Sequence, residues 1–324
     1  MRLIVPALAA FLGLAAPAAA EVPKVVATIK PIHALVASVM GELGTPGLIV
    51  RGGASPHTYS LRPSDASALG AADVVFWTGH GLELFLEDSL GTLAPQAAVV
   101  ALSENPAITL LPVREGGAFE AHAHGDEVHE GHDHGDDHEG HDHGDHDHAH
   151  EHEAGDMHFW LDPANAAAML ANIADTLAAA DPEHAATYAA NAAAAAEELT
   201  ALTARVEAVL APVKAKPFVV FHDAYQYFER RFGLSVVGSI TVTPDTMPGA
   251  SRIAEIRARL IEANAACVFA EPQFEPAIVN TIVEGTPART GVLDPEGASL
   301  AEGPGLYAEL VEGLAQGLAD CLAD

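Results

Sequence analysis

The sequence predicts an α/β protein with two lobes, each a parallel β-sheet covered by helices, joined by one long rigid helix. Three observations support this prediction. The chain has 324 residues, more than one typical domain holds. Both halves alternate short apolar runs with helical patterns, which is typical of parallel sheets flanked by helices. Between the halves lies a segment rich in Ala, Glu and Leu, from residue 182 to residue 213.

Strands and helices alternate in the same manner in both halves. In the first half, apolar runs predict strands at 25–29, 48–50, 74–77 and 98–102. Helices are predicted between them at 32–40 and 63–69. In the second half, strands are predicted at 218–221, 236–239, 268–270 and 290–293. Helices are predicted there at 224–232, 251–263, 276–284 and 306–322.

The segment 182–213 has the composition of one long helix. Pro182 follows Asp181, a good N-cap residue. One continuous helix of this length would span about 45 Å at 1.5 Å per residue, more than the diameter of a small domain. A helical hairpin is the alternative, but no Gly or Pro within the segment would turn the chain. The helix is therefore predicted to link an N-terminal lobe, 21–181, to a C-terminal lobe, 214–324.

The first twenty residues have the pattern of a secretory signal peptide. Arg2 precedes an apolar run at 3–16, and the small residues 18–20 form a cleavage site. The run is shorter than the roughly 20 residues that cross a membrane, and no later stretch is long and apolar enough. We expect a mature chain that begins near Glu21 and is soluble in the periplasm, freely or held near a membrane by a partner.

The chain is strongly acidic, with a formal charge of −30. Residues 120–153 supply −13 of this charge, which leaves −17 for the rest. Acidic surfaces repel phosphate groups, so the balance disfavours nucleic acid and anionic membranes as partners. We expect a monomer.

Two cysteines, Cys267 and Cys321, stand 54 positions apart. In an oxidising compartment an isolated pair predicts a disulfide. The spacing differs from the close C-x-x-C pattern of zinc and redox sites. Two buried free thiols are the alternative.

Residues 120–153 form a histidine-rich acidic segment without Lys or Arg. The segment holds twelve of the chain's 18 histidines and thirteen carboxylates. Neutral imidazoles bind zinc, copper and nickel, and carboxylates concentrate cations. So little apolar content predicts a disordered metal-binding loop of low affinity, with a solvated acidic spacer as the alternative. The twelve residues are His122, His124, His129, His132, His134, His138, His141, His143, His146, His148, His150 and His152.

Three of the other histidines stand where parallel α/β proteins bind ligands. His57 lies in a loop after a predicted strand, His158 lies among bulky apolar residues, and His222 directly follows the strand at 218–221. Asp156 and Asp223 are placed to orient the imidazoles of His158 and His222. A single histidine in such a position is more often structural than a ligand, so the surrounding sequence motifs are needed to assign a metal-binding role.

Four sequence motifs surround these histidines and a later aspartate: Ser55-Pro56-His57-Thr58-Tyr59-Ser60-Leu61-Arg62-Pro63-Ser64-Asp65, Asp156-x-His158-x-Trp160-x-Asp162-Pro163, Phe221-His222-Asp223-Ala224-Tyr225-Gln226-Tyr227-Phe228 and Gly291-Val292-Leu293-Asp294-Pro295. These motifs resemble those of the zinc-specific solute-binding proteins of metal ABC transporters, the cluster A-I family. They occur in the family's order and cover essentially the whole mature chain. The resemblance implies two lobes on one long rigid helix, with the metal site in the cleft between the lobes.

The resemblance also implies the metal and its ligands. Manganese members of the family typically carry Glu where this chain has His222, and three imidazoles suit zinc better than manganese. We therefore expect zinc, bound by His57, His158 and His222. Some zinc members place a Glu ligand immediately before the first histidine, but this chain has Pro56 there. Asp294 is the expected fourth ligand.

Other candidates for the fourth position are water, a loop residue and, more weakly, Glu271. His33 and His80 are treated as non-ligands. The function implied is capture of Zn²⁺ outside the cytoplasm and delivery to an ABC-transporter permease. Alternatives are a periplasmic zinc buffer or metallochaperone without a transporter, or a zinc-dependent hydrolase. The sequence contains no H-E-x-x-H or G-x-S-x-G motif that would favour the hydrolase.

Overall fold

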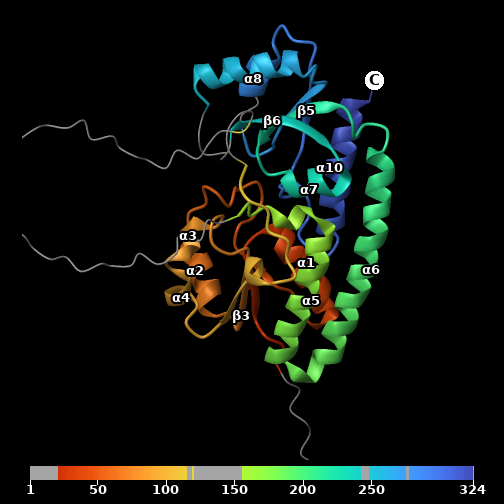
Figure 1. Cartoon of the computed structure of the whole chain (residues 1–324). Helices are drawn as coiled ribbons and strands as arrows, with labels where there is room; N and C mark the ends of the chain where they lie inside the picture. The colour runs from red at the N-terminus through yellow and green to blue at the C-terminus, as the bar shows by residue number, and fades with distance from the viewer. Residues whose placement is uncertain (1–20, 115–118, 120–154, 242–247, 275–276, 324) are drawn as a thin grey trace, which may run out of the picture.

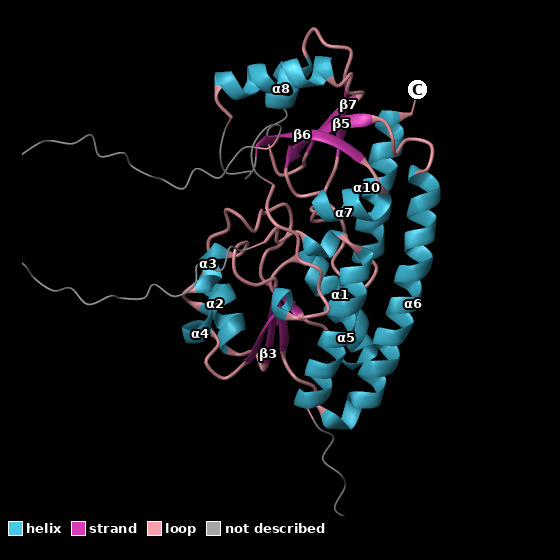
Figure 2. Cartoon of the chain, viewed as in Figure 1, coloured by secondary structure: helices cyan, strands magenta, loops and turns pink. Residues whose placement is uncertain are grey.

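Two parallel β-sheets, one from each half of the chain, form the frame of the molecule (Figures 1 and 2). A computed structural model describes residues 21–114, 119, 155–241, 248–274 and 277–323. The predicted signal peptide, 1–20, and the histidine-rich segment, 120–153, lie outside the described residues. Each sheet has four strands, and helices pack around both sheets, so the two-lobed α/β prediction is confirmed.

The N-terminal sheet has the spatial order β2-β1-β3-β4, with all pairs parallel. Its strands are β1 (Val25–Ala27), β2 (Gly47–Leu48), β3 (Val74–Trp77) and β4 (Ala98–Ala101). The surrounding helices are α1 (Lys30–Met40), α2 (Pro63–Gly70), α3 (Leu84–Glu87) and α4 (Leu90–Leu93), with 3₁₀ turns η1 (Gly41–Leu43) and η2 (Leu102–Glu104). Strands β1 and β3 are buried along their whole length, as expected for central strands of a parallel sheet.

The C-terminal sheet repeats the design in the order β6-β5-β7-β8, again with parallel pairs. Its strands are β5 (Pro217–His222), β6 (Ser235–Thr241), β7 (Cys267–Ala270) and β8 (Arg289–Val292). Its helices are α7 (Gln226–Phe232), α8 (Ala250–Glu262), α9 (Ala277–Val283) and α10 (Leu306–Leu322). The central strands β5 and β7 lie side by side, which brings residues that follow them in sequence close together in space.

A helical hairpin connects the two sheets. After the 3₁₀ turn η3 (Phe159–Leu161), α5 (Pro163–Ala180) runs antiparallel to α6 (Ala185–Leu210), which extends along both lobes (Figure 1). The sequence did not predict α5 as a separate helix. The segment predicted as one helix from 182 begins instead with the 3₁₀ turn η4 (Pro182–His184).

The side chain of Asp181 holds the turn of the hairpin through hydrogen bonds to other side chains. Its carboxylate accepts hydrogen bonds from His184 Nδ1 at 2.7 Å and Tyr188 Oη at 2.9 Å. The turn of the hairpin therefore lies just before the long helix, at Pro182–His184, and the helix itself is continuous from Ala185 to Leu210. The 26 residues of α6 still span about 39 Å.

One apolar core extends through both lobes. It includes Phe76 of β3, Leu202 of α6 and Phe218 of β5 in a single cluster, and helices α1, α5 and α10 pack within it. A second, smaller cluster on the C-terminal sheet includes Val219 and Ile256 of α8. The lobes are therefore held together by a shared core as well as by α6. Among the described residues, no helix has the length and apolar character needed to cross a membrane.

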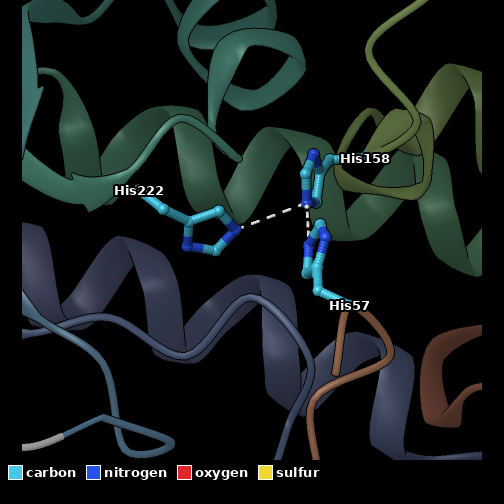
Figure 3. Close-up of side chains that lie close together, drawn as sticks. All are labelled: His57, His158 and His222. Carbon is cyan, nitrogen blue, oxygen red and sulfur yellow. Dashed lines mark hydrogen bonds between the residues drawn. The ribbon is translucent and has the colours of Figure 1, made fainter. Parts of the chain in front are cut away.

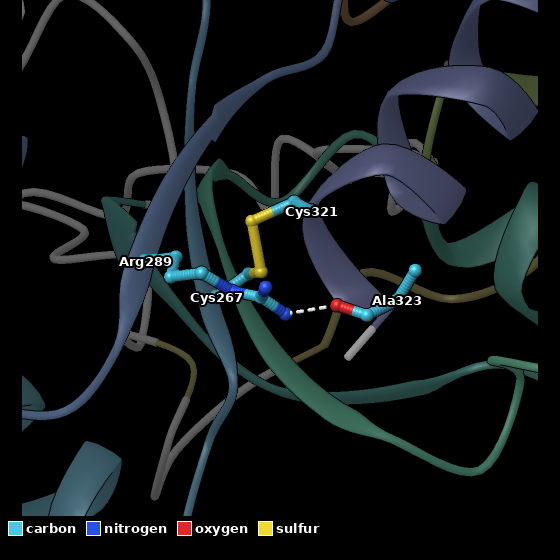
Figure 4. Close-up of a disulfide and its surroundings, with 4 residues drawn as sticks. All are labelled: Cys267, Arg289, Cys321 and Ala323. Carbon is cyan, nitrogen blue, oxygen red and sulfur yellow. Dashed lines mark hydrogen bonds between the residues drawn. A yellow bond between two sulfur atoms is a disulfide. The ribbon is translucent and has the colours of Figure 1, made fainter.

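The predicted disulfide is confirmed. Cys267 of β7 and Cys321 of α10 are joined, and Arg289 of β8 donates a hydrogen bond to the carbonyl oxygen of Ala323 just beyond α10 (Figure 4). Both cysteines are buried. These two links fasten the last helix to adjacent strands of the C-terminal sheet.

Removing this disulfide should lower the free energy of unfolding by about 4 kcal/mol in the chain-entropy model, because the bridge closes a loop with a sequence separation of 54 residues. The measurement is urea unfolding of the Cys267→Ala/Cys321→Ala variant and the parent chain. A chelator must be present, since bound metal adds its own stabilisation. Equal free energies of unfolding for the two chains would contradict the prediction.

Candidate metal centre

Three histidines from separate parts of the chain converge between the two sheets (Figure 3). His57 comes from the loop after β2, His158 immediately precedes η3, and His222 is the last residue of β5. The Nε2 atoms of His57 and His158 are 3.2 Å apart, and those of His158 and His222 are 3.4 Å apart. Within the described part of the chain, no other group of three His, Cys, Asp or Glu brings its ligand atoms this close.

These spacings suit a tetrahedral ion. With zinc–nitrogen bonds of about 2.0–2.1 Å, two nitrogens at neighbouring corners of a tetrahedron are about 3.3–3.4 Å apart. The three imidazole ring centroids are also nearly equidistant, at 5.2–5.6 Å. Facing nitrogen lone pairs repel one another unless a proton or a cation lies between them. The arrangement is therefore built to receive a cation.

Buried carboxylates orient two of the three rings. His158 Nδ1 donates to Asp156 Oδ1 at 2.8 Å, and His222 Nδ1 donates to Glu271 Oε1 at 2.6 Å. With the proton held on Nδ1, the lone pair of Nε2 points to the centre of the site. The predicted orienting role of Asp156 is confirmed.

The orienting role predicted for Asp223 is wrong. Its carboxylate pairs with Arg114, and Glu271 takes the position beside His222. Glu271 directly follows β7, which pairs with β5, so the order of the strands places it next to the end of β5. That order is a property of the folded sheet. Glu271, considered as a weaker ligand candidate, thus contacts the outer nitrogen of a histidine.

Burial and charge give His57 and His222 opposite proton affinities. Burial, followed by the neighbouring imidazoles of His158 and His222, holds the pKa of His57 well below its usual value. Burial alone would also lower the pKa of His222, but the charge and hydrogen bond of Glu271 outweigh it and raise that pKa. His57 is therefore neutral at neutral pH, whereas His222 keeps a proton to higher pH when no metal is bound.

Asp294 lies after β8 and is half-buried. Its Oδ1 accepts hydrogen bonds from the Glu296 amide at 3.2 Å and from Gln273 Nε2 at 3.4 Å. The group of ligand atoms within 4.8 Å of one another contains the three histidines without Asp294. Its role as fourth ligand remains a prediction.

The other two histidines considered lie elsewhere. His33 is buried on α1, with Nε2 donating to the Pro46 carbonyl at 3.1 Å. His80 has an exposed side chain and packs its ring edge-on against Trp77. Neither joins the three-histidine group.

An ion cluster that was not predicted from the sequence lies beside the site. Arg114 pairs with Asp223 and Glu229, and together with His57 and His158 it lines a cavity of about 90 Å³. Burial alone would lower the pKa of Arg114, but hydrogen bonds to the two carboxylates raise it. The sequence held a signal: Arg114 is the only Lys or Arg between Arg62 and Arg205.

Two parallel-sheet lobes with an imidazole site between them define the class of metal-binding solute-binding proteins. The chain belongs to the family described as "ZnuA: Zinc-uptake complex component A periplasmic", whose model matches residues 25–321. The predicted family is thereby confirmed.

Relatives match along most of their length. The "High-affinity zinc uptake system protein ZnuA" of Brucella suis biovar 1 is 52% identical over 311 residues, which cover 94% of this chain and 93% of that protein. The protein of the same description from Paracoccus denitrificans is 45% identical, with 97% of each chain covered. A structure titled "Crystal structure of ZnuA" shares the fold, with a TM-score of 0.73 at 23% identity, covering 94% of this chain and 100% of that one.

Zinc binding should release protons at mildly acidic pH, because the raised pKa of His222 favours the protonated ring and the metal displaces that proton. Affinity should therefore fall as pH falls through the pKa of His222. Glu271→Gln removes the charge that raises this pKa, so it should release fewer protons. It should also bind zinc roughly ten- to a hundredfold more weakly.

Calorimetry of the chain lacking residues 120–153, in buffers of different ionisation enthalpy, measures the protons and the affinity together. Equal proton release and affinity for the parent and the Glu271→Gln variant would contradict the assigned role of Glu271.

Proposed function

We propose that this chain is the extracytoplasmic binding protein of a high-affinity zinc uptake system. It captures Zn²⁺ between its lobes and delivers the ion to the membrane permease of an ABC transporter. The observation that carries the proposal is the convergence of His57, His158 and His222 at tetrahedral spacing. Its relatives carry the name of zinc uptake proteins.

The donor chemistry favours zinc as the cargo. Three neutral nitrogen donors suit a borderline ion such as Zn²⁺, whereas Mn²⁺ and Mg²⁺ prefer oxygen. The orienting carboxylates of Asp156 and Glu271 make the rings more basic and supply negative charge close to the ion. A zinc ion can thus be held without a full set of anionic ligands.

Asp294 is proposed as the fourth ligand, with water as its substitute. Asp294 follows β8, which pairs with β7, and so it shares an edge of the sheet with Glu271. Burial, then Glu271, then Asp294 raise the pKa of Tyr225, whose hydroxyl donates to Glu271 at 3.1 Å. The carboxylate of Asp294 therefore contributes negative charge to the surroundings of His222, which supports its proposed role as the fourth ligand.

The histidine-rich segment, 120–153, is proposed to collect zinc outside the specific site. Its interchangeable imidazoles and carboxylates would hold several ions, and the entropy lost when so polar a segment orders around a metal would make each of these sites weaker than the specific one. The family description places its members in the periplasm, which agrees with the proposed signal peptide at 1–20. The permease would then be the partner that receives the ion.

Replacing any one of His57, His158 or His222 with Ala should abolish most of the tight zinc binding. The loss should exceed the roughly ten- to hundredfold effect of removing an orienting group. Asp294→Ala should lower the zinc affinity less than the loss of a histidine does, because water can take the place of the carboxylate. Calorimetry of the chain lacking residues 120–153 measures each affinity, with His80→Ala as the matched control. Unchanged affinity in all three histidine variants would exclude this site.

Deleting residues 120–153 should leave one tight zinc per chain and remove the additional weaker ones. The weaker sites should fade between pH 7.5 and 5.5, because free imidazoles protonate near pH 6.5. Zinc titration of the mature chain and the deletion variant at both pH values tests this. Loss of the tight site on deletion would place the specific ligands in the segment itself.

A further inference from the structure

Arg114 binds two carboxylates of the C-terminal lobe at once. Its Nε donates to Asp223 Oδ2 at 2.9 Å, and its Nη1 donates to Glu229 Oε2 at 2.7 Å. Its Nη2 donates to the remaining oxygen of each, to Glu229 Oε1 at 2.9 Å and to Asp223 Oδ1. The guanidinium thus uses its planar fork twice, a geometry that only arginine offers.

This cluster borders the three-histidine site. Asp223 directly follows His222, and Asp223 and Arg114 line the same cavity as His57 and His158. The carboxylate side chains are only 5% and 10% exposed, and the ring of Phe119 covers the guanidinium at 3.9 Å. A cation entering this cavity therefore meets two kinds of donor, the imidazoles and the pair of carboxylates.

The two carboxylates would suit a different metal from the imidazoles. One oxygen of Asp223 and one of Glu229 accept from the same nitrogen, so a cation placed where Nη2 lies would contact both. Oxygen donors of this kind favour hard ions such as Mn²⁺ and Ca²⁺. Two buried carboxylates without a cation between them also repel each other, which would add to the attraction for any ion.

We propose that Arg114 is a specificity-determining residue of the metal site. Its guanidinium occupies the place of a cation between Asp223 and Glu229, and so it leaves the imidazoles as the donors that an incoming metal meets. This proposal rests on the proposed zinc-binding function and deepens it. Zinc selectivity then depends on one positive charge beside the ligands as well as on the ligands themselves.

The test compares Mn²⁺ binding by the full mature chain and by its Arg114→Ala variant. One equivalent of zinc is first added to each chain to fill the tight three-histidine site, and the histidine-rich segment, which is the same in both chains, contributes equally to the two titrations. Mn²⁺ is then titrated, and free Mn²⁺ is followed by its electron paramagnetic resonance signal. The variant should bind one more Mn²⁺ than the parent, with at least about tenfold higher affinity, because the freed oxygens form a hard-ion site.

Matched variants separate selectivity from a structural role. Arg231 forms a comparable two-bond pair with Asp162, so Arg231→Ala removes a similar ion pair and should gain no Mn²⁺ site. Arg114→Lys keeps a positive charge between the carboxylates, so it should bind no more Mn²⁺ than the parent chain. Adding Asp223→Asn or Glu229→Gln to Arg114→Ala should abolish the gained site.

A folded Arg114→Ala variant that gains no Mn²⁺ would overturn the proposal, since Arg114 would then be only a structural tie. If Arg114→Ala fails to fold, Arg114→Gln supplies the same readout with a longer neutral side chain. Failure of both to fold would also overturn it, because the cluster would be a folding requirement. A parent chain that binds no zinc would refute the proposed function, while the Mn²⁺ comparison would still decide the role of Arg114.

Discussion

The meeting of three imidazole nitrogens, with His158 Nε2 at 3.2 Å from His57 Nε2 and 3.4 Å from His222 Nε2, is the constraint on which the rest of the structure depends. Lone pairs at this distance repel one another unless a proton or a cation lies between them. The lobes must therefore be held in place by interactions that do not involve the metal. The shared apolar core and the long helix α6 provide them.

Polar contacts across the lobes reinforce this arrangement. The Lys30 ammonium on α1 donates to the carbonyl oxygens of Gly297 at 2.5 Å and Leu300 at 2.7 Å, in the loop that follows Asp294. The Trp160 indole, two residues after His158, donates to the Pro295 carbonyl at 2.9 Å. The loop that bears the proposed fourth ligand is thus anchored to the N-terminal half of the chain. A prearranged site of this kind loses little entropy when an ion binds.

Much of the site could be predicted from sequence because each motif carries its chemistry locally. Each of the three histidines, His57, His158 and His222, lies in a recognisable sequence motif. Asp156 lies two residues from His158, whose ring it orients. The contact between Glu271 and His222 was not predictable in this way, because it depends on β7 lying beside β5. Helix α5 was overlooked although its sequence carries helix signals: Asp162 caps it before Pro163, and Met169, Ile173 and Leu177 repeat at helical spacing on its buried face. Arg114 was overlooked since its partners lie more than a hundred positions away.

The central claim is that one zinc ion sits among the three Nε2 atoms. The most direct measurement is an anomalous difference map at the zinc edge from crystals of the zinc-loaded mature chain. The account predicts one dominant peak about 2.0–2.1 Å from Nε2 of His57, His158 and His222, with an Asp294 oxygen or a water completing the tetrahedron. A dominant peak bound by other residues, with none among these three nitrogens, would contradict it.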